Sequence, residues 1–89
     1  MQSIPFRDLC YNGDIPNILL RIPSKSLSDL NKGLTSACDG GNTDVVKLLI
    51  LNGAYKYDDG FYLACRNGHI EIVKLLISKG ADDFDKGLI

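Results

Sequence analysis

The sequence predicts an all-α fold, a solenoid of about three stacked helix-turn-helix repeats that form a single domain over residues 1–89. Three observations lead to this prediction. The chain repeats itself at a regular interval, each repeat contains two apolar patterns with helical spacing, and in the two clear repeats a glycine follows each pattern. A chain of 89 residues is long enough for one small domain.

The 27-residue period is clearest when residues 33–59 are aligned with residues 60–86, because 12 of the 27 pairs are then identical. The identical pairs are Gly33/Gly60, Ala37/Ala64, Cys38/Cys65, Gly41/Gly68, Val46/Val73, Lys47/Lys74, Leu48/Leu75, Leu49/Leu76, Ile50/Ile77, Gly53/Gly80, Ala54/Ala81 and Asp58/Asp85. Chance does not produce this agreement in an ordinary sequence. The two segments are therefore copies of one structural unit.

A divergent copy precedes these two, as expected of a terminal capping repeat. Cys10 and Gly13 precede Cys38 and Gly41 by an interval one position longer than the period. The expected repeats run approximately over 5–31, 32–58 and 59–86, and residues 87–89 form the start of a truncated further repeat.

Each repeat is expected to hold two short helices. Phe61, Ala64 and Cys65 are spaced to share one face of the first helix. Gly68 supplies the turn, and the second helix runs from about residue 70 to residue 79. Helices this short are unstable alone in water, so their apolar faces must be buried by neighbouring repeats.

The first helices are expected to begin with a polar cap. Asn31, Asp58 and Asp85 occupy the same place in successive repeats, just before the apolar pattern. Side-chain oxygens of Asn and Asp accept hydrogen bonds from free backbone N–H groups at helix starts. These residues are therefore the predicted N-caps.

The segment Ala64-Cys65-Arg66-Asn67-Gly68-His69-Ile70-Glu71-Ile72-Val73-Lys74-Leu75-Leu76-Ile77-Ser78-Lys79-Gly80-Ala81-Asp82 resembles the ankyrin repeat. The resemblance covers residues 33–86 strongly and residues 6–32 weakly, and it implies the ankyrin fold. The usual unit has about 33 residues, so the 27-residue unit here implies that the hairpin fingers are shortened or absent. Short units of this kind resemble those of large DNA viruses.

No residue pattern in the sequence indicates catalysis, a cofactor or a metal site. His69 is the single histidine, and its position in a Gly-His turn favours packing or a loop hydrogen bond over acid–base chemistry. Cys10, Cys38 and Cys65 share one repeat position, where small buried side chains let helices approach. Their spacing does not match zinc-binding patterns. We therefore expect reduced, metal-free cysteines and a protein that is not an enzyme.

The candidate partner-binding residues vary between repeats and face outward from the first helices. They are Arg7, Tyr11, Thr35, Asp39, Tyr62 and Arg66. Tyrosine and arginine are frequent hot spots of protein interfaces. The alternative is that these side chains are ordinary solvated surface, since single exposed aromatic residues are common.

Two classes of function remain open. A third, a regulatory segment of an enzyme, is less favoured. The first is a non-enzymatic protein–protein interaction module, an ankyrin-repeat scaffold or adaptor. The second is a structural fragment of a longer ankyrin array that has no partner of its own. The last repeat keeps an apolar outer face, which favours a fragment and suggests self-association through this uncapped repeat.

The composition and charge favour a protein as the partner over nucleic acid or a membrane. The formal net charge of -1 gives no general attraction to nucleic acid or to an anionic membrane. No apolar run approaches the length of a membrane span, and the N-terminus lacks the pattern of a secretory signal. We therefore expect an intracellular protein, located in the cytoplasm or in a host cytoplasm.

Overall fold

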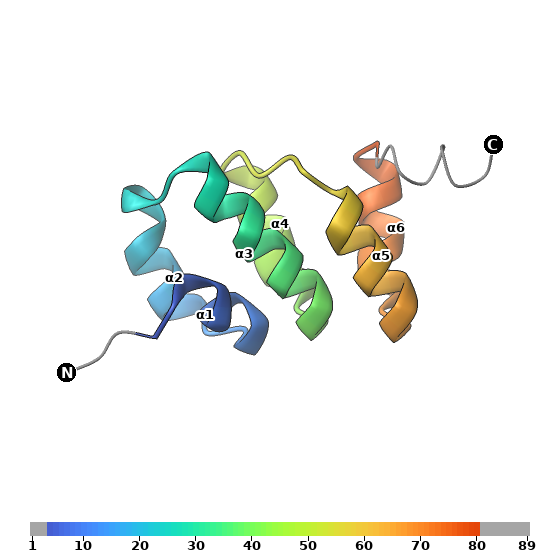
Figure 1. Ribbon diagram of the computed structural model, residues 1–89, viewed down its shortest axis with the longest axis horizontal. Helices are drawn as coiled ribbons and strands as arrows, with labels where there is room; N and C mark the ends of the chain where they lie inside the picture. The colour runs from blue at the N-terminus through green and yellow to red at the C-terminus, as the bar shows by residue number, and fades with distance from the viewer. Residues whose placement is uncertain (1–3, 81–89) are drawn as a thin grey trace.

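The computed structural model describes residues 4–80, and all regular structure in this range is helical (Figure 1). The helices are α1 (Phe6–Asn12), α2 (Ile15–Arg21), the short 3-10 helix η1 (Ile22–Ser24), α3 (Leu27–Gly40), α4 (Thr43–Leu51), α5 (Asp58–Asn67) and α6 (Ile70–Ser78). The six α-helices form three successive pairs, which confirms the predicted all-α stack. No strand occurs in the described range, so hairpin fingers are absent there.

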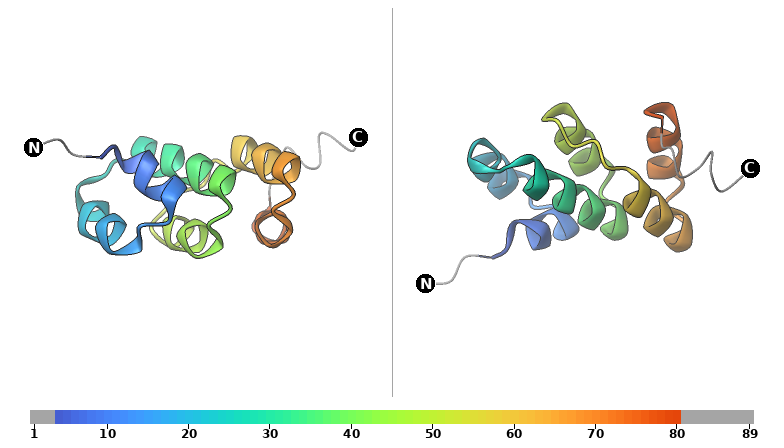
Figure 2. Two further views of the ribbon diagram at one scale, coloured as in Figure 1. Left: turned by 90° about the horizontal axis from the view of Figure 1, so that it is seen from below. Right: turned by 45° about the horizontal axis from the view of Figure 1, so that its top comes forward.

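The helix pairs stack side by side and form two layers (Figure 2). The first helices of the pairs, α1, α3 and α5, make one layer, and the second helices, α2, α4 and α6, make the other. Helix α3 packs against both α1 and α5, whereas α4 and α6 make few contacts with each other. The first helices therefore hold the stack together.

Glycines with positive φ end the first helices, as the sequence predicts. Gly41 has φ 76° and Gly68 has φ 75°, in the left-handed region that side chains with a Cβ rarely adopt. The N–H of Asn42 then donates to the carbonyl of Ala37 at 3.0 Å, which satisfies a free carbonyl at the helix end. The same turn recurs in the next pair, so each second helix leaves its partner in the same direction.

The predicted N-caps Asn31 and Asp58 are wrong. Helix α3 begins earlier, because Ser26 and Asp29 form a capping box in which each side chain accepts a hydrogen bond from the other's backbone N–H. Asn31 therefore lies inside α3. Helix α5 begins at Asp58 itself, and the residue at the cap position is Tyr57, whose side chain forms no cap. The third expected cap, Asp85, lies outside residues 4–80, as does the expected further repeat at 87–89.

The core runs along the whole stack and is built from both layers. Every pair contributes apolar side chains that its own two helices cannot bury alone. The buried apolar residues are Phe6, Leu9, Cys10, Ile18, Leu30, Leu34, Ala37, Cys38, Val45, Val46, Leu49, Ala54, Phe61, Ala64, Ile72 and Leu76. This distribution confirms the prediction that neighbouring repeats bury one another's apolar faces.

The cysteines are free, but they do not share one environment. Cys10 and Cys38 have 0% exposure, and burial raises the pKa of each thiol to about 12. Both lie under a glycine of the next first helix, since a Cβ at Gly33 would approach Cys10 Sγ to 2.9 Å. The prediction that Cys65 is also buried is wrong, because no described helix follows α5 in the first layer to cover it.

Burial predicts a difference between two leucines of the second helices. Leu76 has 0% exposure, and Leu51 has 83% exposure. Leu76→Ala should lower the free energy of unfolding by about 2–5 kcal/mol because it leaves a cavity in the core. Leu51→Ala removes the same atoms from the surface and should change it by no more than about 0.5 kcal/mol. Urea denaturation measures both values, and equal losses would contradict the packing.

The environments of the thiols predict selective protection. In the native protein at about pH 8, Cys10 and Cys38 should resist alkylation, because their pKa of about 12 and their burial leave little accessible thiolate. After denaturation both should react freely. A pulse of iodoacetamide followed by peptide mass spectrometry gives the two rates. Equal labelling of native and denatured protein would show that these thiols are not buried.

Candidate functional site

The six candidate partner-binding residues lie on the three first helices. Helix α1 carries Arg7 and Tyr11, α3 carries Thr35 and Asp39, and α5 carries Tyr62 and Arg66. Because α1 packs on α3 and α3 packs on α5, the structure brings these separate segments into one layer. Sequence periodicity alone does not establish this proximity.

Four of the six side chains are exposed. Tyr11 and Tyr62 have exposed fractions of 50% and 59%, and Arg7 and Arg66 are also exposed. Such aromatic and guanidinium groups can contribute large contact areas and several donors to a partner. These four residues stand at the two ends of the layer, on α1 and α5.

The two candidates on α3 are half-buried and already engaged. The hydroxyl of Thr35 donates to the carbonyl of Asn31 at 3.3 Å, one helical turn earlier. Asp39 accepts a hydrogen bond from the Asn67 amide at 2.7 Å between Oδ1 and Nδ2. Thr35 thus bonds within its own helix, and Asp39 links α3 to α5.

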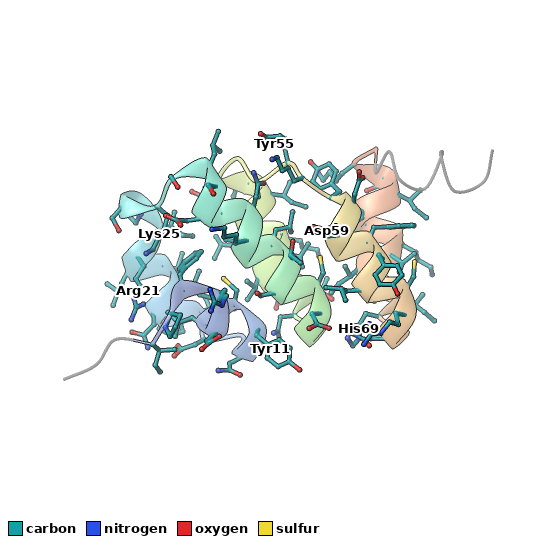
Figure 3. All side chains as sticks on the ribbon, viewed as in Figure 1. Tyr11, Arg21, Lys25, Tyr55, Asp59 and His69 are labelled. Atoms are coloured by element: carbon teal, nitrogen blue, oxygen red, sulfur yellow. The ribbon has the colours of Figure 1, made fainter. Side chains whose placement is uncertain are left out.

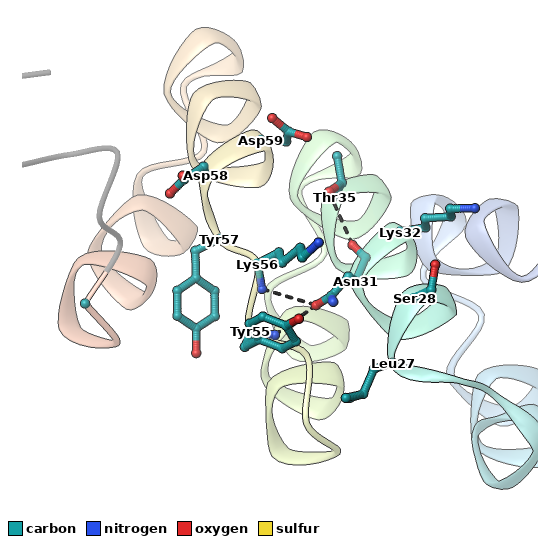
Figure 4. A pocket seen from close by; sticks show the side chains of 11 residues that line it. Leu27, Ser28, Asn31, Lys32, Thr35, Tyr55, Lys56, Tyr57, Asp58 and Asp59 are labelled. Atoms are coloured by element: carbon teal, nitrogen blue, oxygen red, sulfur yellow. Dashed lines mark hydrogen bonds between the residues drawn. The ribbon is translucent and has the colours of Figure 1, made fainter. Parts of the chain in front are cut away.

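A depression lies beside α3, where the segment 52–57 crosses from α4 to the start of α5 (Figure 4). Its volume is about 720 Å³. A second depression of about 470 Å³ adjoins it and extends to Tyr62. Thr35 and Asp59 belong to the lining of both depressions. The hollow surface is therefore continuous with the row of candidate residues.

Asn31 binds the segment of residues 55 and 56, which forms one side of the larger depression. Its side-chain oxygen accepts hydrogen bonds from the backbone N–H groups of Tyr55 and Lys56, at 2.9 and 3.1 Å (Figure 4). Asn31 is 8% exposed, so these bonds are shielded from competing water. The residues at 55 and 56 lie outside the helices, and this buried amide supplies the acceptor that their N–H groups need.

Most residues that line the hollow surface are not among the six predicted from the sequence, which include only Thr35 and Tyr62 of this lining. Lys32, Tyr55, Lys56 and Asp59 are exposed around it. A signal for two of them was present, because Lys32 precedes Thr35 by about one turn and Asp59 stands one repeat period after Lys32. Lys32 and Asp59 occupy equivalent repeat positions and carry opposite charges, so the residue at this surface position differs between repeats. Tyr55 and Lys56 had no helical periodicity that could indicate their orientation.

Polar side chains at the other edge of the layer connect neighbouring helix pairs. The amide of Asn42 donates to the carbonyl of Cys10 at 3.0 Å, and His69 Nε2 lies 3.1 Å from the carbonyl oxygen of Asp39. Figure 3 shows Tyr11 and His69 near this edge, opposite Tyr55. The sequence predicted packing or a loop hydrogen bond for His69, and the ring makes a hydrogen bond whose partner is a carbonyl at the end of α3 rather than one in a loop. The imidazole contacts backbone rather than a nucleophile.

Within residues 4–80, no three His, Cys, Asp or Glu side chains are grouped closely enough to hold a metal ion. In the same range no helix has the length and apolar character that crossing a membrane requires.

The stacked helix pairs define a helical solenoid built from short repeats. The chain belongs to the ankyrin repeat family, since the family model for ankyrin repeats in three copies matches residues 8–86. Ankyrin repeats generally act as protein-interaction modules and are typically not enzymes. No curated protein and no solved structure matches the chain.

The role of Asn31 can be tested against the residue that replaces it in the next repeat. Asn31→Leu leaves two backbone N–H groups without their acceptor and should reduce stability by about 1–3 kcal/mol. Asn31→Asp keeps an acceptor oxygen, as Asp58 does at the equivalent position, and should have a smaller effect. Amide hydrogen exchange at Tyr55 and Lys56 should accelerate only in Asn31→Leu. Unchanged exchange in that variant would show that Asn31 does not hold this segment.

Proposed function

We propose that this protein is a non-enzymatic scaffold or adaptor that binds a partner protein across the exposed sides of α1, α3 and α5. The contact surface includes Arg7, Tyr11, Thr35, Asp39, Tyr62 and Arg66. It extends into the depressions beside Thr35. The interaction site is thus the layer of first helices.

The observation that supports this proposal most is the continuity of the hollow surface with the candidate residues of the first helices. Thr35 lines both depressions, and Tyr62 at the end of the second depression is 59% exposed. Lys32 and Asp59 add one charge of each sign beside Thr35. A concave surface with aromatic and charged groups suits a protein segment, because apolar contact supplies affinity and charge supplies orientation.

An intracellular location, in the cytoplasm or in a host cytoplasm, belongs to the same proposal. Cys10, Cys38 and Cys65 are all free. Unpaired thiols are typical of a reducing compartment. A cytoplasmic partner would therefore bind the protein with its three cysteines as free thiols.

The experiment compares the proteins captured from the native cell by the intact chain and by two double variants. Tyr62→Ala with Arg66→Ala removes exposed groups from α5 and should weaken capture of the specific partner by about tenfold or more, as expected when interface hot spots are truncated. Lys47→Ala with Lys74→Ala alters the exposed surface of α4 and α6 and should leave capture unchanged. Quantitative mass spectrometry of the bound fraction provides the comparison.

Circular dichroism should first show that both double variants keep the helix content and melting temperature of the intact chain. Loss of the partner only in the Tyr62 and Arg66 variant then supports the layer of first helices as the binding surface. Equal capture by all three proteins, or loss only in the Lys47 and Lys74 variant, would contradict it.

A further inference from the structure

Asn31 presents two hydrogen-bond donors to the larger depression. Its side-chain oxygen accepts from the backbone N–H groups of Tyr55 and Lys56, and these two bonds fix the orientation of the amide. The amide nitrogen Nδ2 donates to no atom of the described residues, although Asn31 is only 8% exposed. Every fully buried side-chain nitrogen and oxygen in residues 4–80 has a partner, so Nδ2 reaches the surface of the depression that Asn31 lines (Figure 4). A ligand in the depression can therefore accept from this nitrogen.

Lys56 brings a positive charge to the same part of the depression. Because its backbone N–H donates to the Asn31 oxygen, its side chain starts beside the amide, and Figure 4 shows it extending toward α3. Lys56 is exposed and forms no ion pair with any other described residue. An ammonium group next to amide N–H donors suits a carboxylate, which carries the opposite charge and accepts several hydrogen bonds.

The charges of the lining favour a single carboxylate over a phosphate group. Lys32 and Lys56 are balanced by Asp58 and Asp59, so the formal charge of the lining sums to zero. A phosphate of about two negative charges would gain no net attraction from this lining as a whole. One carboxylate beside Lys56 needs only one positive charge and stays on the side of the depression that Asn31 occupies.

The remaining surface favours an internal segment of a protein chain. Leu27 and Tyr55 are 51% and 54% exposed at the depression, and a peptide can cover this apolar surface whereas a small anion cannot. The depression continues past Thr35 into the second depression, which reaches Tyr62. A chain that ended beside Asn31 could extend in only one of these two directions. The carboxylate is therefore better supplied by a side chain than by a chain terminus.

We propose that this part of the depression binds an aspartate or glutamate side chain of an extended partner segment, held by Asn31 Nδ2 and the ammonium group of Lys56. The inference rests on the proposed function and specifies the partner chemistry that the same site selects. Asn31 then has two roles. Its oxygen holds the crossing segment beside α3, and its nitrogen contacts the partner.

Selection from a random peptide library displayed on phage tests the acidic preference. Peptides joined to the coat protein through their C-terminus have no free terminal carboxylate, so any acidic preference comes from side chains. The intact chain should enrich peptides with Asp or Glu at one position. Lys56→Glu should reverse this preference to Lys or Arg, because it places the opposite charge beside Asn31. Lys47→Glu makes the same change of net charge on the exposed side of α4 and should leave the preference unchanged.

Calorimetry with a synthetic copy of an enriched peptide tests the amide itself. Asn31→Asp keeps an oxygen for the N–H groups of Tyr55 and Lys56 but replaces the two donors by a negative charge, and it should weaken binding about tenfold or more. Changing the acidic residue of the peptide to its neutral amide should weaken binding to the intact chain similarly and should have little further effect on Asn31→Asp. Unchanged hydrogen exchange at Tyr55 and Lys56 would show that the loss is not caused by release of the crossing segment.

Several outcomes would overturn the inference and can be told apart from failure of the proposed function. Enriched peptides without an acidic preference, or equal binding by Asn31→Asp and the intact chain, would overturn the inference alone if binding still requires Tyr62 and Arg66. An acidic preference that persists in Lys56→Glu would also overturn it. So would a selection that enriches no peptide, and the capture experiment with the Tyr62 and Arg66 variant would then decide the proposed function separately.

Discussion

The stack depends on the close approach of neighbouring first helices. Gly33 and Gly60 allow this approach, because any Cβ at either position would collide with Cys10 or Cys38 of the preceding pair. Small residues on both sides of the contact bring the helix backbones together. This contact sets the spacing of the first layer, and α4 and α6 touch only lightly in the second layer.

The hydrogen bonds between pairs follow from this spacing. Asn42 reaches the carbonyl of Cys10, and His69 reaches the carbonyl of Asp39, only because each turn lies beside the end of the preceding first helix. These polar contacts satisfy backbone groups that short helices leave free. Packing and hydrogen bonding thus favour the same alignment of neighbouring helix pairs. Both kinds of contact need two pairs, so an isolated pair lacks them.

The candidate surface is a consequence of the same stacking. Helices α1, α3 and α5 bury one side against the second layer and leave the other side exposed, so side chains distant in the sequence become neighbours. Asn31 then anchors the segment 52–57 next to α3 and forms one wall of the depression. The charged residues Lys32 and Asp59 are therefore placed by a packing arrangement that also makes the core.

The 27-residue period was sufficient to predict the helix pairs, the glycine turns and most of the core, because backbone conformation and side-chain direction recur with the repeat. It also placed the six candidate residues on the first helices, where Arg7, Tyr11, Tyr62 and Arg66 are exposed and Thr35 and Asp39 are half-buried. The position of Asn31 inside α3 and the exposure of Cys65 could not be read from the period. The start of α3 depends on a local capping box, and the burial of a cysteine depends on the helix that follows it in space.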